Sequence, residues 1–288
     1  MKELTVISGK GGTGKTSITA AFASLAENAV FADCDVDAAD LHLILKPKIK
    51  KTMKFHGLKI ALINKNLCTD CKKCHDYCHF HAIDQNIDLI KDSCEGCGVC
   101  EFVCPVHAIK MIDRDSGFSY ISETRFGPMV HAVLNTAEEA SGKLVTVVRN
   151  NAKNIADEKQ KDLIIIDGPP GTGCPIIASI NGVDLVLIVT EPTLSAIHDL
   201  ERVFGVAQHF HVTVIVCINK SSINSENTLK IEQYCKKNNI LIVGKLPYDL
   251  TMTQAMIHEK SIIEFSNGVL SKNISEMWNK IIEVFKIK

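Results

Sequence analysis

The sequence predicts an α/β protein with a doubly wound, mostly parallel sheet that is interrupted by a small inserted α+β domain. Three observations indicate this architecture. Short apolar runs alternate with helix-like segments, a glycine-rich loop joins the first run to the first helix, and eight of the twelve cysteines lie between Cys68 and Cys104. With 288 residues, the chain is long enough for one large domain that carries an insertion. We expect residues 1–60 and 116–288 to form the large domain and residues 61–115 the insertion.

The expected elements follow in chain order from the spacing of apolar residues. Residues 3–8 are rich in β-branched side chains and end at glycines, which predicts a strand, and apolar residues at helical spacing over 15–27 predict a helix. A second strand over 29–32 runs into the acidic stretch 33–40, and apolar spacing over 144–155 marks a helix after the cysteines. Further buried strands are expected over 163–166, 185–189, 212–218 and 240–243, and further helices over 196–210 and 226–237. Fully apolar strands that alternate with helices are typical of a parallel sheet covered on both faces.

The composition is that of an ordinary globular protein, with 23% charged and 46% apolar residues. The 32 basic and 33 acidic side chains nearly cancel, which disfavours nucleic-acid binding through overall charge. The longest aliphatic runs are far shorter than the ~20 residues that a transmembrane helix needs, and the N-terminus lacks the apolar core of a secretory signal. We therefore expect a cytoplasmic protein with no transmembrane segment and no nucleic-acid partner.

A phosphate-binding motif follows the first strand. Residues 9–16 match the pattern G-x-x-x-x-G-K-[ST] and lie between a strand and the start of a helix, as the motif requires. Backbone N–H groups at the glycines can turn toward phosphates, Lys15 can reach the terminal phosphates, and the Thr16 hydroxyl can bind Mg²⁺. The motif consists of Gly9, Lys10, Gly11, Gly12, Thr13, Gly14, Lys15 and Thr16. This segment therefore predicts a mononucleotide site.

A second candidate magnesium ligand follows another apolar strand. Asp167 comes directly after the run 163–166 and precedes Gly168-Pro-Pro-Gly171. A carboxylate in this position can hold Mg²⁺ directly or through water, and the glycines and prolines can form a loop that senses the nucleotide. We expect Asp167 and Thr16 to share the metal.

The cysteine-rich segment contains an internal repeat. Each half has the spacing C-x₂-C-x₂-C-x₃-C, and a following His-Ala-Ile recurs at the same offset of 26 residues. The first run is Cys68, Cys71, Cys74 and Cys78, and the second is Cys94, Cys97, Cys100 and Cys104. Thiolates at this spacing are typical ligands of iron–sulfur clusters, whereas a zinc site would normally show paired C-x₂-C knuckles with a longer gap. We expect two [4Fe–4S] clusters, with zinc as the alternative.

The second run continues into Pro105 and resembles bacterial two-cluster ferredoxins. This resemblance implies that the fourth cysteine of each run ligates the other cluster. One cluster would take Cys68, Cys71, Cys74 and Cys104, and the other Cys94, Cys97, Cys100 and Cys78. The sequence departs from the family at His79, where proline usually follows the first run, which puts the local turn in doubt but removes no ligand.

The loop from Lys10 to Thr16 resembles that of the MinD/ParA/nitrogenase-reductase class of P-loop ATPases, as do Asp167-Gly-Pro-Pro-Gly and the segment Gly117 to Pro128. The resemblance implies that Lys10 reaches across an ATP-dependent homodimer to neutralise the partner's phosphates, alongside Lys15 of the same subunit. The alternative is a solvated lysine with no role.

The same resemblance assigns further residues of the nucleotide site. It places a water-orienting aspartate after the second strand, where Asp35 aligns best and Asp37 and Asp40 are alternatives. It also places Asn219 and Pro247 against the adenine. Because Lys220 is followed by two serines, the guanine signature N-K-x-D is absent from the sequence and ATP is favoured over GTP.

The combined motifs predict an ATP-hydrolysing iron–sulfur protein, a nucleotide-gated dimer that couples ATP to electron transfer or to metallocofactor maturation of a protein client or redox partner. The alternative is a MinD/ParA-like spatial organiser whose clusters are structural or sensory. This alternative would require peripheral membrane contact, for which apolar residues at helical spacing over 270–285 are the candidate. A helix packed on the sheet explains the same spacing equally well. Lysines at 46, 48, 50, 51 and 54 predict a solvated loop or a docking patch for an acidic partner.

Overall fold

The computed structural model describes residues 1–135, 138 and 141–287, and the chain forms two compact units. The first comprises the described residues of Met1–Met53, Ser119–Val133 and Ser141–Lys288. The second comprises Lys54–Phe118 with the described residues of Leu134–Ala140. The chain leaves the first unit within strand β3 (Lys48–Ile63) and returns within strand β4 (Ile109–Thr124).

A mainly parallel sheet forms the centre of the first unit. The strand order is β3-β4-β5-β2-β6-β1-β7-β8-β9. The remaining strands are β1 (Lys2–Ser8), β2 (Ala29–Asp33), β5 (Gly127–Leu134), β6 (Leu163–Pro170), β7 (Leu185–Thr190), β8 (Thr213–Ile218) and β9 (Leu241–Lys245). From β5 to β9 the neighbouring strands run parallel, and the central strands are buried along their length. The predicted doubly wound α/β fold is confirmed.

The register of the central strands places polar residues at one edge. Strand β1 lies between β6 and β7, and Leu4 pairs with Ile165 on one side and Leu185 on the other. Asp33 of β2 is the pairing partner of Asp167 in β6. Because parallel strands end at the same edge, the residues that follow β1, β2, β6, β7 and β8 converge there.

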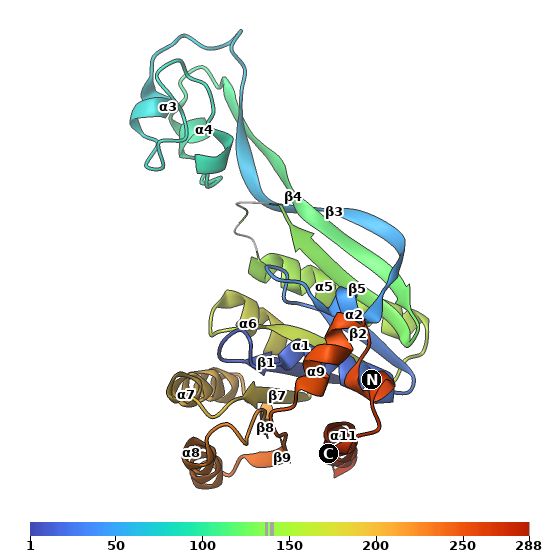
Figure 1. Cartoon of the computed structure of the whole chain (residues 1–288). Helices are drawn as coiled ribbons and strands as arrows, with labels where there is room; N and C mark the ends of the chain where they lie inside the picture. Colours follow the sequence, from blue (N-terminus) through green and yellow to red (C-terminus); the bar gives the residue numbers. More distant parts are fainter. Residues whose placement is uncertain (136–137, 139–140, 288) are drawn as a thin grey trace. The chain divides into compact units, whose positions relative to one another are not determined.

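Helices cover both faces of this sheet, as Figure 1 shows. One face carries α1 (Lys15–Leu25), α2 (Leu41–Leu45), α9 (Leu250–Ile257), α10 (Ile262–Phe265) and α11 (Val269–Ile287), whose apolar residues share a core with alternate residues of the strands. The other face carries α5 (Ser141–Glu158), α6 (Cys174–Ile180), α7 (Leu194–His209) and α8 (Ser225–Lys237). On this face, Arg149 of α5 forms an ion pair with the buried Glu3 of β1 at 2.6 Å.

The second unit is small and rich in turns. Between its stretches of β3 and β4 it contains α3 (Lys73–Asp76), a 3₁₀ turn (Lys91–Ser93) and α4 (Val99–Val103). Its core consists of a few apolar residues that pack with several of the cysteines, among them the buried Ile83, Ile87 and Ile109. This arrangement is the ferredoxin-like insertion that the sequence predicts.

Two sequence expectations need correction. The basic run is not a loop, because Lys48, Lys50, Lys51 and Lys54 lie in β3, which pairs with β4 along one of its edges. Exposed lysines on an edge strand also discourage pairing with another chain. The first helix ends at Leu25 rather than at residue 27, because Ala26 already has an extended backbone with φ of −78° and ψ of 131°. None of the helices in the described ranges has the length and hydropathy of a membrane span.

Candidate functional site

The phosphate loop is held in shape from both sides by close contacts. Gly14 has φ of 91°, and a Cβ there would lie 2.4 Å from Nδ2 of Asn219. A Cβ on Gly9 would lie 2.3 Å from Cβ of Asp199 in α7, so only glycine allows this approach. Nδ2 of Asn219 donates to the carbonyl O of Thr13 at 2.7 Å. Contacts with α7 and with Asn219 therefore fix the shape of the loop.

Lys15, Thr16 and Asp167 meet at the start of α1. Nζ of Lys15 lies 2.9 Å from Oδ1 of Asp167, and the Thr16 hydroxyl donates to Oδ2 of Asp167 at 2.7 Å. Thr19, one turn further along α1, donates to Oδ1 of the same carboxylate at 2.9 Å. A hydroxyl and a carboxylate oxygen in contact are the hard oxygen donors that Mg²⁺ prefers. The Thr16 hydroxyl and the Asp167 carboxylate would hold the metal of a Mg–nucleotide complex.

Three carboxylates surround the single ammonium of Lys15. Burial alone would lower the pKa of Lys15, but the charges of Asp167, Asp35 and Asp33 outweigh it and raise the pKa. Asp35 lies 3.5 Å from Nζ of Lys15, and burial raises the pKa of its carboxyl. The carboxylate of Asp167, which contacts both Lys15 and Thr16, supplies negative charge beside this ammonium group.

Asp33 positions the loop that carries Asp35. Its carboxylate accepts the backbone N–H of Asp35 at 3.2 Å and that of Leu41 at 3.1 Å, so it anchors both ends of the intervening segment. Burial and the neighbouring charge of Asp167 raise its pKa well above the ordinary value. The alternatives Asp37 and Asp40 are exposed, whereas Asp35 is buried. Of the three candidates for the water-orienting aspartate, Asp35 is the one in contact with Lys15.

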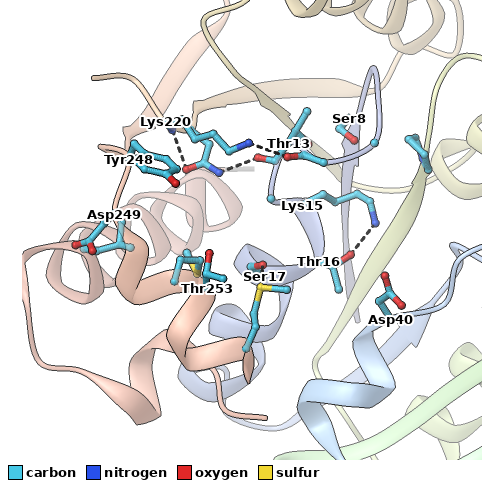
Figure 2. A pocket seen from close by; sticks show the side chains of 18 of the residues that line it. Ser8, Thr13, Lys15, Thr16, Ser17, Asp40, Lys220, Tyr248, Asp249 and Thr253 are labelled. Carbon is cyan, nitrogen blue, oxygen red and sulfur yellow. Dashed lines mark hydrogen bonds between the residues drawn. The ribbon is translucent and has the colours of Figure 1, made fainter. Parts of the chain in front are cut away.

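A pocket of about 530 Å³ opens beside the phosphate loop (Figure 2). The residues from the loop that line it are Gly11, Gly12, Thr13, Gly14, Lys15 and Thr16, and the lining also includes Asp35, Asn219, Pro247 and Tyr248. The hydroxyl Oγ1 of Thr13 is buried and has no partner among the described residues. A glycine-rich loop at the start of a helix and a lysine in one pocket suit a nucleotide with its phosphates. Asn219 and Pro247, which were expected to contact adenine, both line this pocket.

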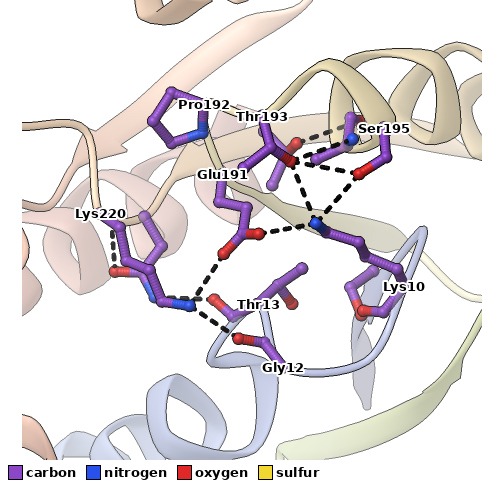
Figure 3. Close-up of polar contacts among 12 residues, drawn as sticks. Lys10, Gly12, Thr13, Glu191, Pro192, Thr193, Ser195 and Lys220 are labelled. Atoms are coloured by element: carbon purple, nitrogen blue, oxygen red, sulfur yellow. Dashed lines mark hydrogen bonds and ion pairs between the residues drawn. The ribbon is translucent and has the colours of Figure 1, made fainter. Parts of the chain in front are cut away.

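Lys10 is not among the described residues that line this pocket. Its Nζ contacts Oε1 of Glu191 at 2.7 Å, and it donates to the hydroxyls of Thr193 at 3.0 Å and Ser195 at 3.2 Å (Figure 3). The second oxygen of Glu191 lies 2.8 Å from Nζ of Lys220. Sequence reasoning missed Glu191, although its position directly after a buried strand, like that of Asp167, was a usable signal.

The eight cysteines of the second unit surround two hollows. One is lined by Cys68, Cys71, Cys74 and Cys104, and the other by Cys78, Cys94, Cys97 and Cys100. Each hollow thus takes three cysteines from one run and the last cysteine of the other run. In the part of the chain that the structure describes, no three His, Cys, Asp or Glu side chains are arranged as ligands of a single metal ion.

The two halves of this unit repeat the same backbone geometry. Asp70 and Lys72 have positive φ in the first half, as Gly96 and Gly98 do at the equivalent positions of the second. The N–H of Ala82 donates to Sγ of Cys78, and that of Ala108 donates to Sγ of Cys104, both at 3.2 Å. Backbone donors aimed at thiolate sulfur are a recognised way in which proteins stabilise iron–sulfur clusters. The donor set fits two four-thiolate clusters.

The fold and the phosphate loop place the chain among known proteins. Residues 4–262 match the family described as the CobQ/CobB/MinD/ParA nucleotide binding domain. The chain belongs to this family. The septum site-determining protein MinD of Pyrococcus horikoshii, solved with Mg-ADP, has the same fold, with a TM-score of 0.62 and 16% identity over 99% of this chain and 98% of that one. The large unit is accordingly a nucleotide-binding domain of the MinD/ParA type.

Two relatives are similar to this chain, one over nearly its whole length and one over about a quarter of it. An uncharacterized protein of Methanocaldococcus jannaschii is 38% identical over 285 residues, which is 98% of this chain and 96% of the relative. The pyruvate synthase subunit PorD of Thermotoga maritima is 43% identical over 75 residues, which is 24% of this chain and 76% of that subunit. The expected resemblance, a family ATPase with a ferredoxin-like insertion, is confirmed.

Proposed function

We propose that the protein hydrolyses ATP as a nucleotide-gated homodimer and couples this cycle to electron transfer, or to metallocofactor maturation, through two [4Fe–4S] clusters. Mg-ATP is the substrate, and Lys15, Thr16 and Asp167 bind its phosphates and metal. Asp35 orients the attacking water. Lys10 leaves Glu191 and reaches the partner's nucleotide.

One observation carries this proposal. Two hollows lined by four cysteines each lie in the same chain as a phosphate loop whose lysine, threonine and aspartate are in contact. When bound, the clusters would supply one-electron redox chemistry. The similarity to PorD supports a redox setting, because that relative is a subunit of pyruvate synthase.

Strands β3 and β4 both run from the first unit into the cysteine unit, and contacts of the nucleotide site lead to β4. Asp33 anchors the backbone N–H of Leu41 at the start of α2. At the other end of α2, the carbonyl O of Leu45 accepts from Nη1 of Arg125 at 2.9 Å, and Arg125 directly follows β4. Strand β4 continues without interruption from Ile109, which lines a cysteine hollow. A displacement of α2 on nucleotide binding would therefore act on β4.

The spatial-organiser alternative depends on membrane contact, for which the structure offers less support. The buried apolar residues of α11 are Leu270, Ile274, Met277, Trp278 and Ile281, and they pack in the core with α1 and the sheet. The apolar face that suggested a membrane anchor is therefore used in packing. The coupling of ATP to redox chemistry is the function that the geometry supports better.

The decisive experiment measures electron transfer under anaerobic conditions. Protein with reduced clusters is mixed with a one-electron acceptor without nucleotide, with ADP and with a slowly hydrolysed ATP analogue, and the sedimentation of each sample is recorded. We expect the ATP analogue alone to produce a dimer and to change the transfer rate. The Lys15→Ala variant serves as the control and should respond to neither nucleotide. Equal rates and unchanged sedimentation in all three samples would contradict the proposal.

A further inference from the structure

Two lysines beside the phosphate loop share one carboxylate. Glu191 directly follows β7, its side chain is 12% exposed, and its two oxygens contact Lys10 and Lys220 at 2.7 and 2.8 Å (Figure 3). Burial alone would raise the pKa of Glu191, but the hydrogen bonds from the two lysines outweigh it and hold the pKa below its ordinary value. Glu191 is therefore ionised at neutral pH, and its single negative charge is shared between the two ammonium groups.

The two lysines serve different parts of the site. Nζ of Lys220 also donates to the carbonyl O of Gly12 at 2.8 Å, so this lysine braces the phosphate loop. Lys10 instead reaches the hydroxyls of Thr193 and Ser195 at the start of α7. It belongs to the phosphate motif, yet it is not among the described residues that line the nucleotide pocket.

We propose that Glu191 is a positioning residue that retains Lys10 on its own subunit and thereby sets the ATP concentration at which two copies associate. The inference rests on the proposed function, in which Lys10 reaches the nucleotide of the partner. To leave, Lys10 gives up a charge-assisted contact with Glu191 and two hydroxyl contacts, while Lys220 stays with the carboxylate. The partner's phosphate must compete against this existing ion pair, and association shifts only by the difference between the two interactions.

A purely structural role for Glu191 makes the opposite prediction. If Glu191 served only to brace the loop through Lys220, its loss would loosen Gly12 and weaken ATP binding, so that more ATP would be needed for association. If it retains Lys10, its loss releases that lysine and less ATP is needed. The direction of the change therefore separates the two roles.

The test compares the ATP concentration for half-maximal dimerisation in the full-length protein and in Glu191→Gln, measured by sedimentation with a slowly hydrolysed ATP analogue. We expect the variant to need about tenfold less nucleotide, as for a coupling of ordinary size. Ser195→Ala is the matched control, because it removes a neutral hydrogen bond from the same ammonium, and it should shift the midpoint less than about twofold. The double variant Lys10→Ala/Glu191→Gln should fail to dimerise, as expected for Lys10→Ala alone.

A second measurement needs no nucleotide. Acylation of Lys10 by an amine-reactive reagent, followed by peptide mass spectrometry, should be several-fold faster in Glu191→Gln than in the wild type. Equal reactivity, an unchanged or raised midpoint, or a gain that survives in the double variant would each overturn the role of Glu191. Failure of the wild-type protein to associate with ATP would instead refute the proposed dimer, so the two ideas fail by different results.

Discussion

At the scale of single residues, the site separates two lysines that belong to one motif. Lys15 lies in the pocket within contact distance of Asp167 and Asp35. Lys10, only five positions earlier in the sequence, is held outside it by Glu191. The two ammonium groups are therefore expected to act at different steps, Lys15 in binding the nucleotide of its own subunit and Lys10 after a partner arrives.

Replacing each lysine should separate binding from turnover. Lys15→Ala should weaken ATP binding by about 100-fold, because a charge-assisted contact to phosphate in a buried site is lost. Lys10→Ala should keep ATP affinity within about threefold and lose dimerisation and hydrolysis, as for removal of a charge that acts on the transferred phosphate. Calorimetric titration with ATP and a phosphate-release assay test the two effects. Equal ATPase rates in wild type and Lys10→Ala would contradict the role of Lys10.

His131 makes the stability of the first unit depend on pH. His131 is 5% exposed, and its ring stacks on Tyr120 at 4.9 Å and on His42 at 5.9 Å. Burial and the charge of His42 lower its pKa from 6.5 to about 4. Between these values the unfolded chain binds the proton and the folded chain does not, so stability falls as the pH falls through this window. Below about pH 4 the loss reaches about 3 kcal/mol.

Urea unfolding followed by the fluorescence of Trp278, the single tryptophan, tests this pH dependence. The variant His131→Phe keeps an aromatic ring between Tyr120 and His42 but cannot be protonated. Its free energy of unfolding should therefore fall less than that of the wild type between pH 6.5 and 4. Parallel curves for the two proteins would show that His131 is not the titrating group.

At the scale of elements, the helices and strands that could be predicted are those marked by a pattern of neighbouring residues in the sequence. The apolar strands β6, β7 and β8 and the loop after β1 were found because burial on both faces leaves continuous aliphatic runs. Strands β3 and β4 were missed, because most of β3 is exposed and its stability comes from pairing with a strand far away in sequence. The contact of Lys10 with Glu191 joins residues 181 positions apart, so local patterns could not reveal it.

The apolar face of helix α11 should stabilise the core of the first unit and should not serve as a membrane-binding surface. Trp278 is 6% exposed, and its ring lies 5.0 Å from that of Phe22 in α1. Trp278→Ala should therefore lower the free energy of unfolding by about 3–5 kcal/mol, whereas Val269→Ala on the same helix, where the side chain is 68% exposed, should change it by less than about 0.5 kcal/mol. Urea unfolding followed by circular dichroism measures both. A small effect of Trp278→Ala would reopen the membrane-anchor interpretation.

At the scale of the whole molecule, one polypeptide combines a nucleotide site with two cysteine-lined hollows, and strand β4 belongs to both units. The hollows take their fourth cysteine from the opposite run, so neither half of the repeat can complete a cluster alone. Loss of one cysteine should therefore affect the cluster of one hollow and spare the other, whichever run the cysteine comes from.

Iron content after anaerobic reconstitution tests this crossed arrangement. The wild type should hold about eight iron atoms per chain, and Cys68→Ser about four, as for two four-iron clusters of which one is lost. Cys68→Ser/Cys104→Ser should lose no more iron than Cys68→Ser, because both cysteines line the same hollow, whereas Cys68→Ser/Cys78→Ser should lose nearly all of it. Cys174→Ser, an exposed cysteine outside both hollows, is the control and should keep the full content. A colourless zinc protein, or equal iron in the two double variants, would contradict the crossed clusters.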